Sequence, residues 1–236
     1  MHSKSTTDEI RERFDNDVER FSNLETGQVS TIDSAISLEL ITESAKRLCP
    51  DAKNLLDIGC GAGNYTLKML SKLPNLNCTL IDLSQPMLDR AKERTGIVTT
   101  GAIKTIQSDI RTAELKEESY DIILAGAVLH HLRDDEDWFA VFAKLYKILK
   151  RGGCLMISDL ITQQSEVLDS YFTDKYTEYL SGIGGTEYAH NVLAYIEKED
   201  SPRPLIYQLN LMKQVGFSEV DVLHKNICFA AYCGIK

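Results

Sequence analysis

Short apolar runs alternate with helical patterns through the middle of the chain. The runs have the length of buried strands and are bounded by turn residues. They cover residues 54–58, 78–82, 102–107, 120–125 and 154–158. Between them, apolar side chains recur at helical spacing over residues 64–73, 86–94 and 136–149. This alternation predicts an α/β domain with a mostly parallel sheet and helices on both faces.

Single residues indicate where the helices begin and end. Thr6 followed by Glu9 forms a capping box, which predicts a helix from that point. Ser84 suits an N-cap, and Pro86 suits the first turn of the helix that follows. The sequence Arg151-Gly152-Gly153 is expected to close the helix over 136–149.

The alternation stops at residue 161, where a long segment of helical character begins. We call residues 161–206 the lid segment, because a long insertion at this point in the chain is a natural cover for a site. Its aromatic residues are expected mostly to dock it on the domain, with Gly182, Gly184 and Gly185 as a hinge. These aromatic residues are Tyr171, Phe172, Tyr176, Tyr179, Tyr188 and Tyr195. A helix over 205–215 and two closing strands near 219–223 and 227–232 follow. The short link between these strands favours an antiparallel hairpin at one edge of the sheet.

The amino-acid composition limits the kinds of molecule that the protein is expected to bind. The 236 residues carry 26 Lys+Arg and 35 Asp+Glu, a formal net charge of −9, which opposes binding to nucleic acid backbones. The N-terminal residues lack the apolar core of a signal peptide, and no apolar run approaches the length of a membrane span. The six cysteines include no C-x-x-C pair and are expected to be reduced thiols. We expect a cytoplasmic protein without membrane or nucleic acid partners.

A glycine cluster follows the first strand in the sequence LLDIGCGAGNYT. Glycines at such a strand end let the backbone turn tightly and let a ligand approach closely. The dinucleotide fingerprint G-x-G-x-x-G does not fit, because Asn64 stands where its third glycine would fall. Asp57 just before the loop is unfavourable for a pyrophosphate and suits an ammonium group. A zwitterionic, cationic cofactor is therefore expected rather than NAD.

Two further acids end neighbouring strands. Asp82 ends the second strand, where a carboxylate can accept hydrogen bonds from the hydroxyls of a ribose. Asp109 ends the third strand region and can accept from an adenine amino group, with Ile110 against the ring. Three acids at three successive strand ends around one glycine loop predict a nucleoside-type cofactor.

These segments resemble the class I S-adenosylmethionine-dependent methyltransferases, closest to the small-molecule group that includes quinone-biosynthesis enzymes. The matching stretches between Asn54 and Asp159 are LLDIGCGAGNYT, LIDLSQPMLDRAK, QSDIRTAEL, YDIILAGAVLHHL and LKRGGCLMISD. The resemblance implies a Rossmann-like, seven-stranded, mostly parallel sheet with an antiparallel last strand, and S-adenosyl-L-methionine as the cofactor.

The resemblance also implies roles for single residues. Gly59 and Gly61 would approach the methionine part of the cofactor, Asp57 would order that loop and the ammonium group, and Asp82 would hold the ribose. The remaining cofactor contacts are assigned to the adenine and to the end of the fourth strand. They are Leu83 and Met87 flanking the adenine, Asp109 and Ile110 on its edge and face, and Ala125 after the fourth strand.

The methyl acceptor is expected beyond the fourth strand. Transfer from a sulfonium mainly needs alignment, and a base is needed only where the acceptor must lose a proton. His130 is the candidate catalytic residue facing the pocket and His131 the structural one, because neighbouring side chains in such a loop usually diverge. Phe14 and Arg20 are expected to reach the cofactor. No metal site is expected, since Asp134 and Asp135 suit a polar helix start.

The proposed organisation is a single methyltransferase domain over residues 1–236. It comprises an N-terminal helical cover (1–50), a cofactor-binding core (51–160), the lid segment (161–206) and a final helix with closing hairpin (207–236). The predicted reaction is direct displacement onto a small, hydrophobic or aromatic acceptor.

Alternatives remain open. The fourth strand continues as Ala125-Gly126-Ala127-Val128, without the Pro-Pro-aromatic motif of nucleobase amino-methyltransferases. The stretch FDNDVERFSN nevertheless has a fainter similarity to tRNA wobble-uridine-modifying relatives. A non-catalytic S-adenosylmethionine-binding module is a second alternative, an NAD-linked enzyme is disfavoured, and a homodimer is left open.

Overall fold

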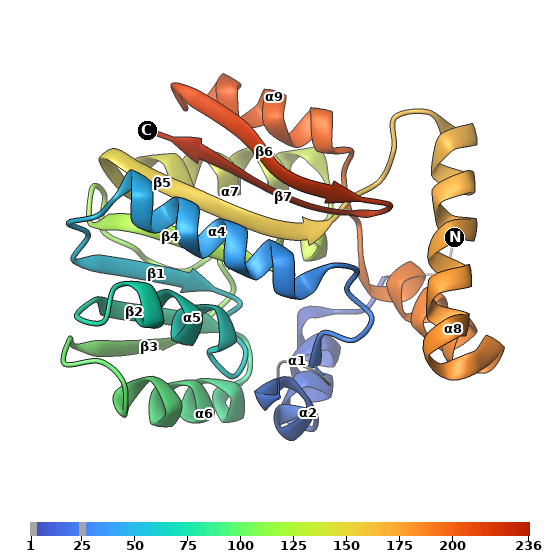
Figure 1. Ribbon diagram of the computed structural model, residues 1–236, viewed down its shortest axis with the longest axis horizontal. Coiled ribbons are helices and arrows are strands. Elements are labelled where there is room, and N and C mark those ends of the chain that lie inside the picture. Colours follow the sequence, from blue (N-terminus) through green and yellow to red (C-terminus); the bar gives the residue numbers. More distant parts are fainter. Residues whose placement is uncertain (1–3, 24–26) are drawn as a thin grey trace.

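The computed structural model describes residues 4–23 and 27–236. They fold around a seven-stranded sheet of order β3-β2-β1-β4-β5-β7-β6 (Figure 1). The strands are β1 (Asn54–Ile58), β2 (Asn77–Asp82), β3 (Ile103–Gln107), β4 (Tyr120–Gly126), β5 (Leu149–Leu160), β6 (Glu219–Asn226) and β7 (Phe229–Ile235). The predicted Rossmann-like fold with an antiparallel last strand is confirmed.

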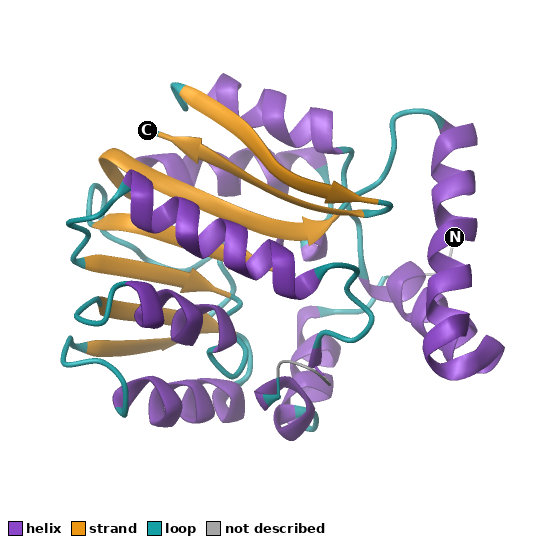
Figure 2. Cartoon of the chain, viewed as in Figure 1, coloured by secondary structure: helices purple, strands orange, loops and turns teal. Residues whose placement is uncertain are grey.

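Helices cover both faces of the sheet, as Figure 2 shows. One face packs against α4 (Ser34–Leu48), α5 (Asn64–Lys72) and α6 (Gln85–Gly96), and the other against α7 (Asp135–Ile148) and α9 (Leu205–Val215). At the carboxyl ends of the parallel strands lie α1 (Thr7–Asp15), α2 (Val18–Ser22) and α8 (Glu166–Glu199) (Figure 1). No helix of the described residues is both long and apolar enough to cross a membrane.

The sequence predicts that the antiparallel strand lies at the edge of the sheet, but the structure places it inside the sheet. β7 pairs antiparallel with β5 on one side and with β6 on the other, so β6 is the edge strand and runs parallel to β5. The hairpin turn also lies later than expected. The predicted link at 224–226 belongs to β6, and the chain turns at Ile227, whose φ is 49°.

The helix starts follow the predicted caps, but one predicted end is wrong. Thr6 and Glu9 form the expected capping box, and the Ser84 side chain accepts a hydrogen bond from the Met87 amide. By contrast, α7 ends at Ile148, and Gly152 and Gly153 lie within β5. A Cβ at Gly153 would lie 2.9 Å from two backbone carbonyl oxygens, which explains the glycine there by close strand packing.

The lid segment forms α8, which projects beyond the sheet (Figure 1). A kink interrupts it at Gly185, where φ is 82° and ψ is 178°. Gly185 is one of the three glycines expected to form a hinge, and movement about it stays a prediction. The hydroxyls of Tyr176 and Tyr179 donate to the carbonyls of Ser30 and Val29 at 2.9 and 3.0 Å. These two tyrosines dock the lid segment on the domain, as predicted.

The N-terminal segment is tied to the end of α8. The amide of Ser5 donates to the carbonyl of Lys198 at 3.1 Å. The guanidinium of Arg13 forms hydrogen bonds to the hydroxyl of Tyr195 and to both carboxylate oxygens of Glu199, a side chain that is almost fully buried. These contacts close the chain over the carboxyl ends of the strands. The six cysteines are free thiols, as expected.

Candidate functional site

A cavity of about 520 Å³ opens at the carboxyl ends of the parallel strands. Open α/β sheets bind their ligands at this edge. Helices α1, α2 and α8 all contribute to its lining. Most of the residues predicted to form the site lie there together. Those that line the cavity are Phe14, Arg20, Gly59, Gly61, Asp82, Leu83, Met87, Asp109, Ile110, His130 and His131.

The glycine loop presents bare backbone to this cavity. Gly59, Gly61 and Gly63 have φ values of 60°, 49° and 84°, in the left-handed region that favours glycine. A Cβ at Gly59 would lie 2.5 Å from Cγ2 of Val128. A Cβ at Gly61 would meet nothing within 4 Å, and this residue lines the cavity. The loop therefore leaves space at Gly61 that a ligand can enter.

Asp82 connects the glycine loop to the end of β2. One carboxylate oxygen accepts from the amide of Gly61 at 2.8 Å, and the other accepts from the amide of Ser84 at 2.9 Å. Burial raises the pKa of Asp82, while these amide donors oppose the rise. Each oxygen has a further lone pair, so this carboxylate can also accept from ligand hydroxyls.

Asp57 lies behind the glycine loop and is not among the described residues that line the cavity. One of its carboxylate oxygens accepts from the hydroxyl of Thr66 at 2.6 Å and from the Thr66 amide at 3.1 Å. Burial raises the pKa of Asp57 to about 7. Asp57 therefore fixes the first turn of α5, directly after the glycine loop, rather than the loop itself. Direct contact with a cofactor ammonium group does not agree with this geometry.

Asp109 lines the cavity with its carboxylate already paired. Arg111 donates to both oxygens, at 3.1 and 2.7 Å, and also bonds to Asp137 at 3.0 Å. Burial raises the pKa of Asp109, but the Arg111 hydrogen bonds and charge outweigh it and lower the pKa overall. A ligand amino group would therefore share this carboxylate with Arg111. Ile110 beside it is buried and lines the cavity.

Ala125 does not lie where the sequence predicts a cofactor contact. It is fully buried within β4 and packs in the core between the sheet and α7. The residues that reach the cavity are Gly126, Ala127 and Val128, at the end of the strand and beyond it. The prediction placed the contact one residue too early, because β4 continues to Gly126.

His130 is anchored on the opposite side of the cavity, in the short helix η1 (Leu129–His131) after β4. Its Nδ1 bonds to Oδ1 of the buried Asp159. The other oxygen of Asp159 accepts from the amides of Leu129 and His130 at 2.8 and 3.2 Å. Burial alone would lower the pKa of His130, but the charges of Asp159 and Asp200 raise it to about 9. At neutral pH the imidazole therefore holds a proton.

His131 also lines the cavity, so the prediction that only one of the two histidines faces it is wrong. The short helix places the two rings 4.3 Å apart. His131 Nδ1 lies 3.1 Å from Oδ1 of Asp200, the residue that ends α8. Burial and the charge of His130 lower the pKa of His131. Both rings thus border the same space, held by two carboxylates from distant segments.

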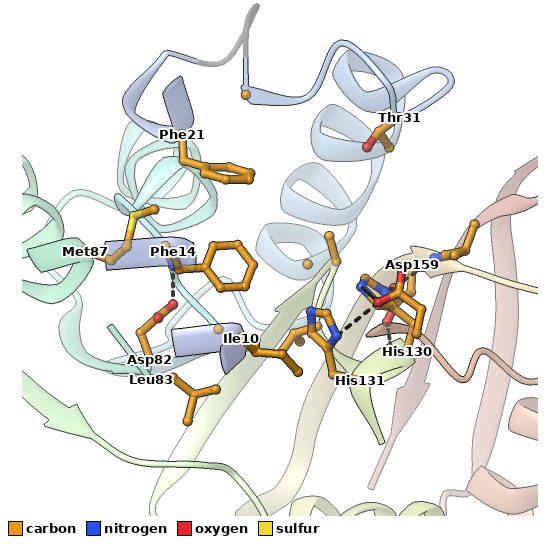
Figure 3. A pocket seen from close by; sticks show the side chains of 18 of the residues that line it. Ile10, Phe14, Phe21, Thr31, Asp82, Leu83, Met87, His130, His131 and Asp159 are labelled. Atoms are coloured by element: carbon orange, nitrogen blue, oxygen red, sulfur yellow. Dashed lines mark hydrogen bonds and ion pairs between the residues drawn. The ribbon is translucent and has the colours of Figure 1, made fainter. Parts of the chain in front are cut away.

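Aromatic side chains of the N-terminal helices lie over the cavity. In Figure 3, Asp82, Leu83 and Met87 lie on one side, and His130, His131 and Asp159 lie on the other. Phe14 packs against Phe21 with ring centroids 5.4 Å apart and meets the His131 ring edge-on at 6.3 Å. The cavity therefore has a glycine and carboxylate side and a histidine side, with apolar rings above.

Two important acids carried no role in the sequence interpretation. Asp159 stands at the end of an apolar run and aligns with the strand ends that hold Asp57 and Asp82, which is a signal that was available. Asp200 follows a long helix, and only the packing of the lid segment brings it to the histidines. The predicted polar helix start at Asp134 is confirmed, since this side chain caps α7 by accepting from the Asp137 amide.

Comparisons with known proteins find methyltransferases and other proteins named for S-adenosylmethionine chemistry. A family model described as a methyltransferase domain matches residues 56–155. A carboxy-S-adenosyl-L-methionine synthase from Vibrio atlanticus is 26% identical over 196 residues, which cover 81% of this chain and 80% of that protein. A protein of the same name from Shewanella woodyi is 28% identical over 199 residues, covering 81% and 79%.

Solved structures show the same fold. The N-methyltransferase NodS from Bradyrhizobium japonicum, in complex with S-adenosyl-L-homocysteine, superposes with a TM-score of 0.61 at 16% identity, covering 94% of this chain and 98% of that chain. An O-methyltransferase family protein from Burkholderia thailandensis gives a TM-score of 0.62 at 14% identity, covering 98% and 70%.

Proposed function

We propose that this chain, a class I S-adenosylmethionine-dependent methyltransferase, transfers the methyl group to a small, hydrophobic or aromatic acceptor by direct displacement. The observation that carries the proposal is the two-sided cavity. Backbone and carboxylate groups suited to the cofactor lie on one side, and two histidines lie on the other, under aromatic rings (Figure 3).

The residues present fit the cofactor. The open space at Gly61 is a cradle that a Cβ would fill. The two oxygens of Asp82 keep acceptor capacity for the hydroxyls of a ribose. Leu83, Met87 and Ile110 supply apolar lining for an adenine. When bound, S-adenosylmethionine supplies an activated methyl group on a sulfonium, so the protein need not form a covalent intermediate.

The protein's own contribution is alignment and exclusion of water. Asp82 fixes the glycine loop through the Gly61 amide, and Asp57 fixes the first turn of α5 through Thr66, which holds the cofactor end of the cavity in one position. Phe14 and Phe21 cover the cavity with apolar surface. Holding donor and acceptor in line is the main source of rate in such a displacement.

The acceptor side combines apolar and polar groups. Tyr176, Tyr188 and Tyr195 from the lid segment line it together with Phe14, which favours a flat or aromatic acceptor. His130 remains the candidate catalytic residue, and its Nε2 is the ring nitrogen that Asp159 leaves for the acceptor or for another partner. The protonated His130 can donate a hydrogen bond from this nitrogen to the acceptor, and it would accept a proton only after losing its own.

A product screen tests this function. The full chain is incubated with S-adenosylmethionine and pools of aromatic metabolites, and S-adenosylhomocysteine is measured together with acceptors that have gained a methyl group. We expect one class of pool to raise S-adenosylhomocysteine above the blank, and Asp82→Asn to reduce the signal. If every pool released the same amount of S-adenosylhomocysteine as the blank without a pool, the proposed transfer would be overturned.

The similarity to carboxy-S-adenosylmethionine synthases over about four fifths of both chains favours a second candidate. In that reaction the cofactor itself would leave as a carboxylated product. The molecule that donates the carboxyl group would itself carry a negative charge, so a cation would be needed near the methyl group to bind it. Arg13 and Arg20 both line the cavity. Arg13 is bound to Glu199 and Arg20 to Asp17, which makes this candidate the weaker one. Mass spectrometry of the nucleoside products in the same screen distinguishes the two.

A further inference from the structure

Three potential metal ligands converge on the histidine side of the cavity. One ligand atom each from His130, His131 and Asp200 lies within 4.8 Å of the others. Oδ1 of Asp200 is 3.1 Å from Nδ1 of His131 and 3.8 Å from Nε2 of His130. Metal–ligand bonds of about 2.1 Å place neighbouring ligand atoms about 3.0 to 3.4 Å apart. The His131–Asp200 separation already falls in this range, and the other separations, 3.8 Å and at most 4.8 Å, would have to shorten around one ion.

Two of these atoms are buried without hydrogen bonds. Within residues 4–23 and 27–236, Nδ1 of His131 and Oδ1 of Asp200 have no hydrogen-bond partner, although they lie close enough for an ion pair. The Asp200 side chain is only 3% exposed. Buried polar atoms are nearly always hydrogen-bonded, so exceptions call for a partner of another kind.

The third ligand is oriented as metal-bound histidines usually are. The Nδ1 of His130 bonds to Asp159, so its Nε2 is turned toward Asp200. A carboxylate behind an imidazole fixes the ring and strengthens its other nitrogen as a ligand. Asp159 is itself fixed by the amides of Leu129, His130 and Leu160. This arrangement is a complete outer shell for one ligand.

The charge of the cluster also suits a cation. Asp159 and Asp200 contribute two buried carboxylates. Imidazoles are neutral when they act as ligands, so the ion would replace the proton that His130 holds at neutral pH. Arg13 adds a nearby positive charge, but its guanidinium is paired with Glu199. Two imidazole nitrogens and one carboxylate oxygen, with coordination positions left free, form a ligand set typical of divalent zinc, cobalt or iron. Such a set needs no cysteine.

We propose that His130 Nε2, His131 Nδ1 and Asp200 Oδ1 bind one divalent first-row transition metal ion beside the methyl-transfer site. The remaining coordination positions face the cavity, where an oxygen or nitrogen of the acceptor can occupy one of them. A bound hydroxyl would lose its proton to solvent at a lower pH than when free. The oxygen then bonds to the methyl carbon as the carbon–sulfur bond breaks. His130 would in this case hold the ion rather than accept the proton itself.

No metal site was predicted from the sequence. Neighbouring histidines are too common to indicate a ligand pair, and Asp200 lies far along the chain. Only the return of the chain after α8 brings the carboxylate to the rings. Metal binding does not depend on the identity of the acceptor, so it can be tested apart from the proposed function.

Cobalt is a suitable probe because its visible absorption reports coordination. The chelator-treated full chain is titrated with Co²⁺, and the absorption and the stoichiometry are measured. We expect one ion per chain and nitrogen and oxygen coordination. His131→Ala should weaken binding at least 10-fold, and Asp159→Asn, which removes only the outer carboxylate, should weaken it about 10- to 100-fold.

A matched control comes from another histidine–aspartate pair. His224 Nε2 lies 2.9 Å from Asp33 at the surface, away from the cavity, so His224→Ala should leave Co²⁺ binding unchanged. Circular dichroism of each metal-free variant shows whether it folds, and His131→Gln replaces any variant that does not. No saturable binding, or binding that His131→Ala leaves unchanged, would overturn the proposal. Titration with S-adenosylhomocysteine is scored separately, so failure of the metal site leaves the cofactor site tested on its own.

Discussion

The carboxylate of Asp82 accepts a hydrogen bond from the backbone amide of Gly61 at 2.8 Å. This contact joins the end of β2 to the loop that leaves β1, so one side chain sets the position of the cradle. Its second oxygen fixes the start of α6 through Ser84. One buried carboxylate therefore holds two backbone segments at the cofactor end of the cavity.

Asp82→Asn should weaken binding of S-adenosylhomocysteine by about 10-fold or more, or about 1.4 kcal/mol. The amide keeps one acceptor oxygen, and its NH₂ group cannot accept from Gly61. Isothermal titration calorimetry measures the change. Asp89→Asn is the control, because Asp89 is an exposed residue that bonds to Gln85. Equal affinities for Asp82→Asn and the unmodified chain would remove Asp82 from the ribose role.

Alanine at two neighbouring glycines should have different effects. Both have positive φ, so each variant has a backbone cost of about 1 to 2 kcal/mol. Gly59→Ala also drives a Cβ into Val128, so it should lose more stability. Gly61→Ala places its Cβ in the cavity, so it should retain most of its stability and lose cofactor affinity. Thermal melting and calorimetry separate the effects, and identical melting temperatures would contradict this assignment.

The raised pKa of Asp57 predicts a pH-dependent stability. The carboxyl titrates near 3.8 in the unfolded chain and near 7 when folded, so the folded protein binds the extra proton between these values. The Asp57 contribution to the free energy of unfolding is full below about pH 4 and is lost as the pH rises toward 7. Urea unfolding at a series of pH values should show that Asp57→Asn gains stability relative to the unmodified chain across this window.

Asp51→Asn is the matched control for the pH series, because Asp51 is an exposed residue in the turn before β1. Its stability should run parallel to that of the unmodified chain at every pH. A parallel curve for Asp57→Asn as well would show that the buried carboxyl does not hold the additional proton.

The kink in α8 should require glycine at Gly185 but not at Gly182. Gly185 has φ 82° and ψ 178°, a conformation that side chains strongly disfavour, so Gly185→Ala should cost about 1 to 3 kcal/mol. A Cβ at Gly182 would meet nothing within 4 Å in helical backbone, so Gly182→Ala should be neutral or slightly stabilising. Hydrogen exchange of residues 186–199 reports the effect on the lid segment. Equal exchange in both variants would argue against a glycine hinge.

The core of the fold could be predicted because local signals agree there. The apolar run predicted as a strand over 54–58 ends before Gly59, and β1 spans Asn54–Ile58. Ser84 caps its helix with its own side chain, which needs no distant partner. The position of β7 could not be predicted in this way. Its place between β5 and β6 depends on pairing with residues 69 to 81 positions earlier in the chain.

The residues of the candidate site show the same contrast between local signals and long-range packing. Gly61 and Asp82 belong to adjacent strand ends, so their meeting follows from a parallel sheet. Asp200 and His131 meet only because α8 returns to the sheet, and no local pattern records that return. Ala125 was misplaced by one residue, since the end of a buried strand is not marked by its apolar pattern.

Calorimetric titration of the full chain with S-adenosylhomocysteine, S-adenosylmethionine and NAD tests whether the cavity binds the proposed cofactor. We expect one saturable site per chain for both sulfur compounds and no binding of NAD. Tight binding of NAD, with no binding of either sulfur compound, would contradict it.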